Sequence, residues 1–321
     1  MQNGACPVIV IFAPTACGKT ALVEKLFGQS SLYAFKGMAE AVSADSQAVY
    51  RSLNIGTAKP TENERKQIPY HLIDIVDADE QFGLGDFLPS ADSACKEILS
   101  RNKVPIVVGG TGFYIRAFLM GLPKTPESDP SVRAGLKERI EKEGNSSLYE
   151  ELKKVDPATA NRIHINDAYR ICRALEVYYT LGKPLSLCRV PETLRKDFNF
   201  CTIVLERPRE ELYSRIEKRV EEMFSQGLCN EVEELKKMGF TKESPGMKAI
   251  GYHEFFEEDS FLSDGSLDLE SVKKKIVLNS RHYAKKQYTY IKDIPDSHII
   301  NADDTEEAYR IIKDFLAESL W

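Results

Sequence analysis

An apolar run that leads through a loop of small residues into a helical pattern constrains the fold of this chain most. The run Val8–Phe12 contains no polar residue, the loop is Ala13-Pro-Thr-Ala-Cys-Gly-Lys-Thr20, and residues 20–26 have helical spacing. A second apolar run, Pro105–Val108, enters Gly109-Gly-Thr-Gly112 and another helical segment, 113–120. Two such units predict a parallel sheet with helices on both faces.

The middle of the chain has a different pattern. From Pro123 to about Arg195, short charged segments are separated by Asp129-Pro130, Asp156-Pro157 and Gly182-Lys-Pro184, with no strand pattern. We therefore expect a P-loop NTPase-like α/β core, residues 1–123 and 196–321, with a smaller helical insertion domain, residues 124–195.

The C-terminal part is expected to complete this core. Cys201–Leu205 is a plausible further strand, and a long amphipathic helix begins after Arg207-Pro208. Its apolar stripe consists of Leu212, Ile216, Val220 and Met223, and Arg215 and Arg219 lie one turn apart on an adjoining face. Residues 257–271 are predicted to form an exposed loop.

The loop at 13–20 predicts phosphate binding. Between a buried strand and a helix, backbone N–H groups can surround phosphate oxygens, and the positive end of the helix dipole adds to the attraction. Lys19 would give a positive charge to the terminal phosphate, and Thr20 could ligate Mg²⁺. The strict pattern has glycine where this chain has Ala13, which takes a positive φ only at a cost if the turn requires one. The candidate phosphate-binding residues are Ala13, Pro14, Thr15, Ala16, Cys17, Gly18, Lys19 and Thr20.

Asp45 follows an apparent short strand. At the carboxyl end of a parallel strand it would face the ligand crevice near the phosphate loop. Because Ser-Gln-Ala follows it, Asp45 could equally cap the N-terminus of a helix. The loop Gly109–Gly112 is a further place where the backbone can approach a ligand.

Composition narrows the environment and the partners. No apolar run approaches the length of a membrane-spanning helix, and the seven cysteines are scattered without a C-x-x-C pair or a preceding leader, so we expect a cytoplasmic protein with reduced thiols. The net charge of −6 argues against general nucleic-acid binding. However, residues 273–292 carry seven Lys or Arg, three Tyr and no acid, which indicates either a solvated helix face or a nucleic-acid-binding strip.

Taken together, these segments resemble the tRNA dimethylallyltransferases, also called tRNA isopentenyltransferases, over nearly the whole chain. The resemblance rests on residues 13–20, Ser43-Ala-Asp-Ser-Gln47, Asn54-Ile-Gly-Thr-Ala-Lys-Pro60, Pro69-Tyr-His-Leu-Ile-Asp74, Gly109–Gly112, Asn166–Glu176 and Ala249-Ile-Gly-Tyr252. It implies transfer of the dimethylallyl group of dimethylallyl diphosphate to N6 of adenine 37 in tRNA, with release of diphosphate and with Mg²⁺ as cofactor.

The resemblance also implies roles for individual residues. The phosphate loop would bind diphosphate, Asp45 would act as general base, Lys19 would stabilise the leaving group, and Thr111 and Arg219 would hold the diphosphate or the tRNA backbone. The residues expected to contact tRNA are Asp45, Ser46, Gln47, Ala48, Thr111, Arg133, Tyr169, Arg170, Arg173, Lys248, Gly251, Arg281, Lys285, Lys286 and Gln287. An amine needs a proton acceptor as the new C–N bond forms, so a carboxylate suits the site.

Four residues depart from the family pattern, and three other functions are compatible with parts of the sequence. Ala13 replaces Gly, Cys17 replaces Ser, and Lys286 and Tyr290 stand where Arg and Trp are more usual. No Cys and His pairs follow with zinc-finger spacing, which favours the short bacterial form, expected to be a monomer. The alternatives are a P-loop kinase of small metabolites, an enzyme that prenylates free AMP or ADP, and a non-enzymatic RNA-binding module.

Overall fold

Six parallel strands form one sheet in the order β3-β2-β4-β1-β5-β6. The computed structural model describes residues 6–126, 128–189, 191–291 and 294–320. The strands are β1 (Cys6–Phe12), β2 (Ala39–Ser43), β3 (Tyr70–His71), β4 (Val104–Gly109), β5 (Phe198–Glu206) and β6 (Ser297–Asn301). The predicted P-loop NTPase-like parallel sheet is therefore confirmed.

Burial explains which strands the sequence reveals. Val8–Phe12 of β1 and every residue of β4 are buried, so these two strands read as continuous apolar runs. Strand β2 is also buried throughout, but Glu40 and Ser43 interrupt its apolar pattern. The edge strands β3 and β6 were missed, because β3 has only two residues and β6 is mostly exposed.

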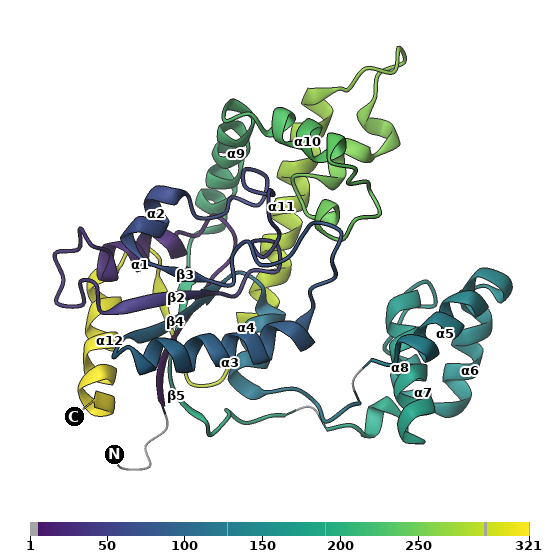
Figure 1. Ribbon diagram of the computed structural model, residues 1–321, viewed down its shortest axis with the longest axis horizontal. Coiled ribbons are helices and arrows are strands. Elements are labelled where there is room, and N and C mark those ends of the chain that lie inside the picture. Colours follow the sequence, from purple (N-terminus) through teal and green to yellow (C-terminus); the bar gives the residue numbers. More distant parts are fainter. Residues whose placement is uncertain (1–5, 127, 190, 292–293, 321) are drawn as a thin grey trace. The chain divides into compact units, whose positions relative to one another are not determined.

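Helices cover both faces of the sheet (Figure 1). On one face, α1 (Lys19–Phe27), α9 (Arg209–Ser225) and α12 (Thr305–Leu320) contribute to a single apolar core with β1, β2, β4 and β5. On the other, α3 (Leu84–Ser100) packs on β2 and β4 and stacks Phe87 on Tyr114 of α4 (Gly112–Met120). The predicted stripe of α9 is confirmed, since its buried residues are Leu212, Ile216, Val220 and Met223.

The part of the chain that contains the sheet has several further helical elements. They are α2 (Glu62–Gln67), α10 (Leu228–Lys237), α11 (Leu269–Ile291) and the 3-10 turns η2 (Gly246–Lys248), η3 (His253–Phe256) and η4 (Glu258–Ser260). The prediction of an exposed loop over 257–271 is wrong in part. Ser260 is fully buried, and α11 already begins at Leu269, where Asp268 accepts a hydrogen bond from the backbone N–H of Ser271.

Residues Met120–Leu194 form a second compact unit, and the first comprises the chain up to Leu119 and from Arg195. The second unit contains α5 (Pro130–Glu143), α6 (Asn145–Val155), α7 (Pro157–Ala160), α8 (Ala168–Leu181) and η1 (Leu185–Leu187), and its described residues include no strand. Its own core includes Leu136, Leu148, Leu152, Ile171 and Leu175. The sequence predicts 124–195 for this unit, and its tRNA contact stays a prediction.

The predicted breaks in the second unit are the ends of its helices. Asp129 caps α5 by accepting from the backbone N–H of Ser131, and Asp156 caps α7 by accepting from that of Thr159. Gly182, with φ 64°, ends α8 in the left-handed conformation.

In the part of the chain that the structure describes, no helix is both long enough and apolar enough to cross a membrane.

Candidate active site

The phosphate loop lies between β1 and α1, as predicted, and its backbone settles the question of Ala13. The left-handed conformation occurs at Ala16, with φ 59°, and at Gly18, with φ 112°, whereas Ala13 is not among the residues with positive φ. Alanine in place of glycine at position 13 therefore carries no backbone strain. The ammonium of Lys19 folds over this loop and donates to the carbonyls of Ala13, at 2.8 Å, and Pro14, at 2.9 Å.

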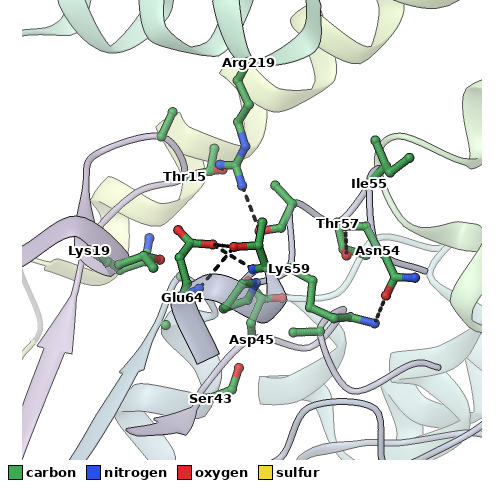
Figure 2. Close-up of a pocket in the computed structure, with 18 of the residues that line it drawn as sticks. Thr15, Lys19, Ser43, Asp45, Asn54, Ile55, Thr57, Lys59, Glu64 and Arg219 are labelled. Atoms are coloured by element: carbon green, nitrogen blue, oxygen red, sulfur yellow. Dashed lines mark hydrogen bonds between the residues drawn. The ribbon is translucent and has the colours of Figure 1, made fainter. Parts of the chain in front are cut away.

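Three arginines bond to successive residues of the loop. Arg219 Nη1 donates to Thr15 Oγ1 at 2.9 Å, Arg215 Nε donates to the Ala16 carbonyl at 2.9 Å, and Arg207 Nε donates to the Cys17 carbonyl at 3.3 Å. Figure 2 shows Arg219 reaching from its helix toward Thr15. The sequence identified Arg219 alone as functional, although the one-turn spacing of Arg215 and Arg219 was a signal that both face the same loop.

Asp45 lies just past the carboxyl end of β2, and the structure decides between its two interpretations. No α-helix begins there: the Asp45 Oδ1 accepts from the backbone N–H of Gln47 at 2.9 Å within a series of turns. Among the described residues, no Lys, Arg or His nitrogen comes within 4.0 Å of its carboxylate. The N-cap reading is wrong, and the carboxylate is left available to a ligand.

Thr111 joins the loop after β4 to the loop that contains Asp45. Its Oγ1 accepts from the backbone N–H of Ser46 at 3.0 Å and donates to Ser46 Oγ at 3.3 Å. Gly109 is required here, because a Cβ on it would lie 2.1 Å from the carbonyl oxygen of Ala44. The predicted catalytic residues Asp45 and Thr111 are thus held on two adjacent loops.

These groups open onto one cavity of about 990 Å³, lined among others by Lys19, Thr20, Asp45 and Arg219. Loop 54–60 forms another wall (Figure 2). Its Lys59, whose side chain is 1% exposed, donates to Asn54 Oδ1 at 3.1 Å and to Asp74 Oδ1 at 2.5 Å. Sequence reasoning gave Lys59 no role, because nothing in the sequence indicates that this lysine is buried.

The charges in the cavity act on one another. Burial lowers the pKa of Lys19 to about 8, and the nearby Cys17 and Asp45 oppose this shift. Burial also lowers the pKa of the Arg219 guanidinium, and Asp45 again opposes the shift. Two cations held partly out of water beside loop N–H groups form a site for a strong anion.

The donors present fit a magnesium ion bound mainly through a substrate. Among the described residues, no three His, Cys, Asp or Glu side chains converge as a metal site. The cavity instead offers the Thr20 hydroxyl and the carboxylate of Asp45. Mg²⁺ commonly binds with few protein ligands, and substrate phosphates and water complete its coordination.

Three of the predicted tRNA-binding residues of the core are buried. Gln287, 2% exposed, accepts from the backbone N–H of Thr15 at 2.9 Å and donates to the Gly110 carbonyl at 2.5 Å. Ala48 and Gly251 are also buried. The two polar ends of Gln287 are thus already used to join the phosphate loop to the loop after β4, which the sequence did not foresee.

The predicted cations of the core differ in availability. Lys248, Lys285 and Lys286 are exposed. Arg281 instead pairs with Glu217, and its guanidinium lies 4.9 Å from the ring centroid of Tyr213. The basic strip predicted over 273–292 lies on α11 as far as Ile291, and Lys292 lies outside the described residues.

The predicted residues of the second unit gather around the start of α8. Tyr169 is 71% exposed, and the guanidinium of Arg133 lies 5.7 Å from its ring centroid. Arg173 pairs with the buried carboxylate of Glu176 at 2.9 Å, and Arg170 pairs with Asp167 at 2.8 Å. The structure therefore brings Arg133, Tyr169 and Arg173 together within this unit.

Comparison with known proteins agrees with this architecture. The model of the IPP transferase family matches residues 48–294. The tRNA dimethylallyltransferase 2 of Geotalea daltonii is 44% identical over 284 residues, which cover 88% of this chain and 84% of the relative. The tRNA dimethylallyltransferase 1 of Syntrophotalea carbinolica is 41% identical over 308 residues, which cover 96% of this chain and 94% of the relative.

Solved structures resemble the whole chain as well. The tRNA isopentenylpyrophosphate transferase of Bacillus halodurans aligns with a TM-score of 0.67 and 32% identity, covering 98% of this chain and 97% of that one. A eukaryotic dimethylallyltransferase acting on tRNA aligns with a TM-score of 0.81 and 28% identity, covering 98% and 80%. With a family model and relatives that match most of its length, this chain belongs to the IPP transferase family, the family of the tRNA dimethylallyltransferases.

Proposed function

We propose that this protein transfers the dimethylallyl group from dimethylallyl diphosphate to N6 of adenine 37 in tRNA, giving N6-(dimethylallyl)adenosine and diphosphate. One observation carries the proposal beyond the family relationship. The free carboxylate of Asp45 opens onto the same cavity as a phosphate loop that is flanked by Lys19 and Arg219. A proton acceptor and an anion site thus share one space.

The phosphate loop and the two cations bind the diphosphate and stabilise its departure. As the bond between C1 of the dimethylallyl group and the diphosphate oxygen breaks, the electron pair leaves with the oxygen and negative charge accumulates there. Lys19 and Arg219 are already in place for that charge, so they need little rearrangement during the reaction. Mg²⁺ held by Thr20 and the diphosphate would supply further neutralisation of the leaving group.

Asp45 accepts the proton. The lone pair of the adenine N6 nitrogen forms the new bond to C1. As this bond forms, one N6 proton passes to the Asp45 carboxylate. Thr111 holds the neighbouring Ser46 and so fixes the turn on which Asp45 lies. General-base assistance of this kind typically contributes about 10²–10⁴-fold to the rate.

The tRNA must present an unstacked adenine, because the N6 amine of a stacked base cannot reach Asp45. The exposed Lys248, Lys285 and Lys286 and the Arg133–Tyr169 pair are suited to hold the RNA backbone and bases. The cytoplasmic location and the monomeric state stay predictions.

The test is transfer of radiolabel from dimethylallyl diphosphate, with Mg²⁺, to an unmodified anticodon stem-loop with adenines at positions 36, 37 and 38. The protein is compared with Asp45→Asn, which keeps the shape of the side chain, and with Asp79→Asn, which changes an exposed carboxylate elsewhere. We expect labelled RNA, a loss of about 10²-fold or more with Asp45→Asn, and no loss with Asp79→Asn.

Other outcomes would redirect the assignment. Label only in AMP or ADP would identify an enzyme that prenylates free nucleotides. Phosphoryl transfer from ATP without any prenyl transfer would identify a small-molecule kinase. RNA binding without either reaction would leave only an RNA-binding module.

A further inference from the structure

A single carboxylate on α10 holds three consecutive backbone N–H groups of loop 54–60. Glu231 accepts from the N–H groups of Asn54, at 3.1 Å, of Ile55, at 2.9 Å, and of Gly56, at 3.3 Å. Consecutive N–H groups that converge on one anion make a compact and directional anchor. Two distant segments, one before α2 and one after α9, are joined at this point.

Tyr252 completes the anchor from a third segment. Its hydroxyl donates to Glu231 Oε1 at 2.6 Å and accepts from the backbone N–H of Gly56 at 3.1 Å. The ring is fully buried and leaves no room beside Gly56, where an added Cβ would lie 2.5 Å from a ring carbon. Burial and the Glu231 charge raise the pKa of Tyr252, so its hydroxyl remains a donor.

Gly251 allows this close approach. Its φ is +99°, and a Cβ on it would lie 2.8 Å from the carbonyl oxygen of Gly56. Both glycines are therefore needed for contact between the two backbones. This contact gives a structural reason for the Ala249–Tyr252 motif, in which Gly251 is too buried to be a simple surface contact.

The anchored loop reaches the active site through Ala58. The carbonyl of Ala58 accepts from Arg219 Nη2 at 3.4 Å, while Arg219 Nη1 donates to Thr15 Oγ1 at 2.9 Å. The guanidinium is thus held between loop 54–60 on one side and the phosphate loop on the other. Ala58 itself has φ 48°, a conformation that non-glycine residues keep only when their surroundings enforce it.

We propose that Glu231 and Tyr252 are positioning residues: they fix loop 54–60 and, through the Ala58 carbonyl, hold Arg219 at the diphosphate. The role of Arg219 in this proposal rests on the proposed function. Neither Glu231 nor Tyr252 lines the cavity, so each acts through the loop.

The variants Glu231→Gln and Tyr252→Phe test the anchor. The first replaces one of the two accepting carboxylate oxygens with an NH2 group, and the second removes the hydroxyl. The matched controls are Glu234→Gln, which breaks an exposed pair with Lys237 on the same helix, and Tyr33→Phe, which removes another Tyr–Glu hydrogen bond. Hydrogen exchange of the 54–60 amides and steady-state transfer kinetics are measured on the full chain. We expect faster exchange and a kcat lower by about tenfold in both test variants, an unchanged KM for the stem-loop, and no change in either control.

A double-mutant cycle with Arg219→Ala separates positioning from general loss of stability. If Glu231 acts through Arg219, Glu231→Gln should lower kcat less than about twofold once Arg219 is absent. Additive losses would overturn the proposal, and so would unchanged exchange of the 54–60 amides in both test variants. A wild-type protein that transfers no prenyl group would refute the proposed function, whereas the exchange measurement would still decide whether the anchor exists.

Discussion

Raising the pH through the pKa of Lys19 should weaken diphosphate binding. An anion prefers the protonated form of the lysine, and in the free protein burial lowers the pKa of Lys19 to about 8. If the bound diphosphate keeps the lysine charged, the apparent Kd scales with one plus the ratio of neutral to charged lysine. That factor is about 1.1 at pH 7, about 2 at pH 8 and about 11 at pH 9. Binding should therefore weaken about tenfold between pH 7 and pH 9, or about 1.4 kcal/mol.

Arg219, Cys17 and Tyr283 should not contribute to the pH dependence in this range. Arginine stays charged, so Arg219 does not titrate despite its lowered pKa. Burial raises the pKa of the Cys17 thiol and raises that of Tyr283 to about 12. The second ionisation of a phosphate group lies near pH 6, below the range.

Isothermal titration calorimetry with dimethylallyl diphosphate, without RNA, measures both the Kd and the protons taken up. At pH 8 about half a proton should enter the complex, seen as a dependence of the measured heat on the ionisation enthalpy of the buffer. Lys19→Met should bind more weakly at pH 7 and show a flat profile. A Kd that does not change from pH 7 to pH 9, or one that changes equally in Lys19→Met, would refute the reasoning.

Three further substitutions test the packing around the site. Asp74→Asn removes the charged partner of the buried Lys59 ammonium and should lower the free energy of unfolding by about 3 kcal/mol, measured by urea denaturation; addition of Lys59→Met should recover part of that loss. Gly109→Ala places a Cβ against the Ala44 carbonyl and should lower the melting temperature and abolish transfer, whereas unchanged values would show that the loops can separate. In the second unit, Glu176→Gln should weaken stem-loop binding and leave the Kd for dimethylallyl diphosphate unchanged, because Glu176 holds Arg173; equal loss of both would contradict this.

The sequence by itself determined the nucleus of the fold and the phosphate loop. Strands buried on both faces are apolar nearly throughout, so β1 and β4 could be read directly. Asp129-Pro130 could be read as a break between segments, and the break is the capped start of α5 because capping chemistry is local. The edge strands β3 and β6 gave no such signal, because each has one neighbour and little buried surface.

Only the tertiary structure decided which side chains share the site and which ones hold it together. Asp45 could be read as a helix cap until the chain around it proved to be turns. Gln287 looked like part of a basic surface strip, but it bonds to Thr15, which is 272 residues away in the sequence. Lys59, Glu231 and Tyr252 acquire their partners only when separate segments pack together. Periodicity and caps report interactions between residues a few positions apart, whereas burial and long-range hydrogen bonds depend on neighbours that the fold alone supplies.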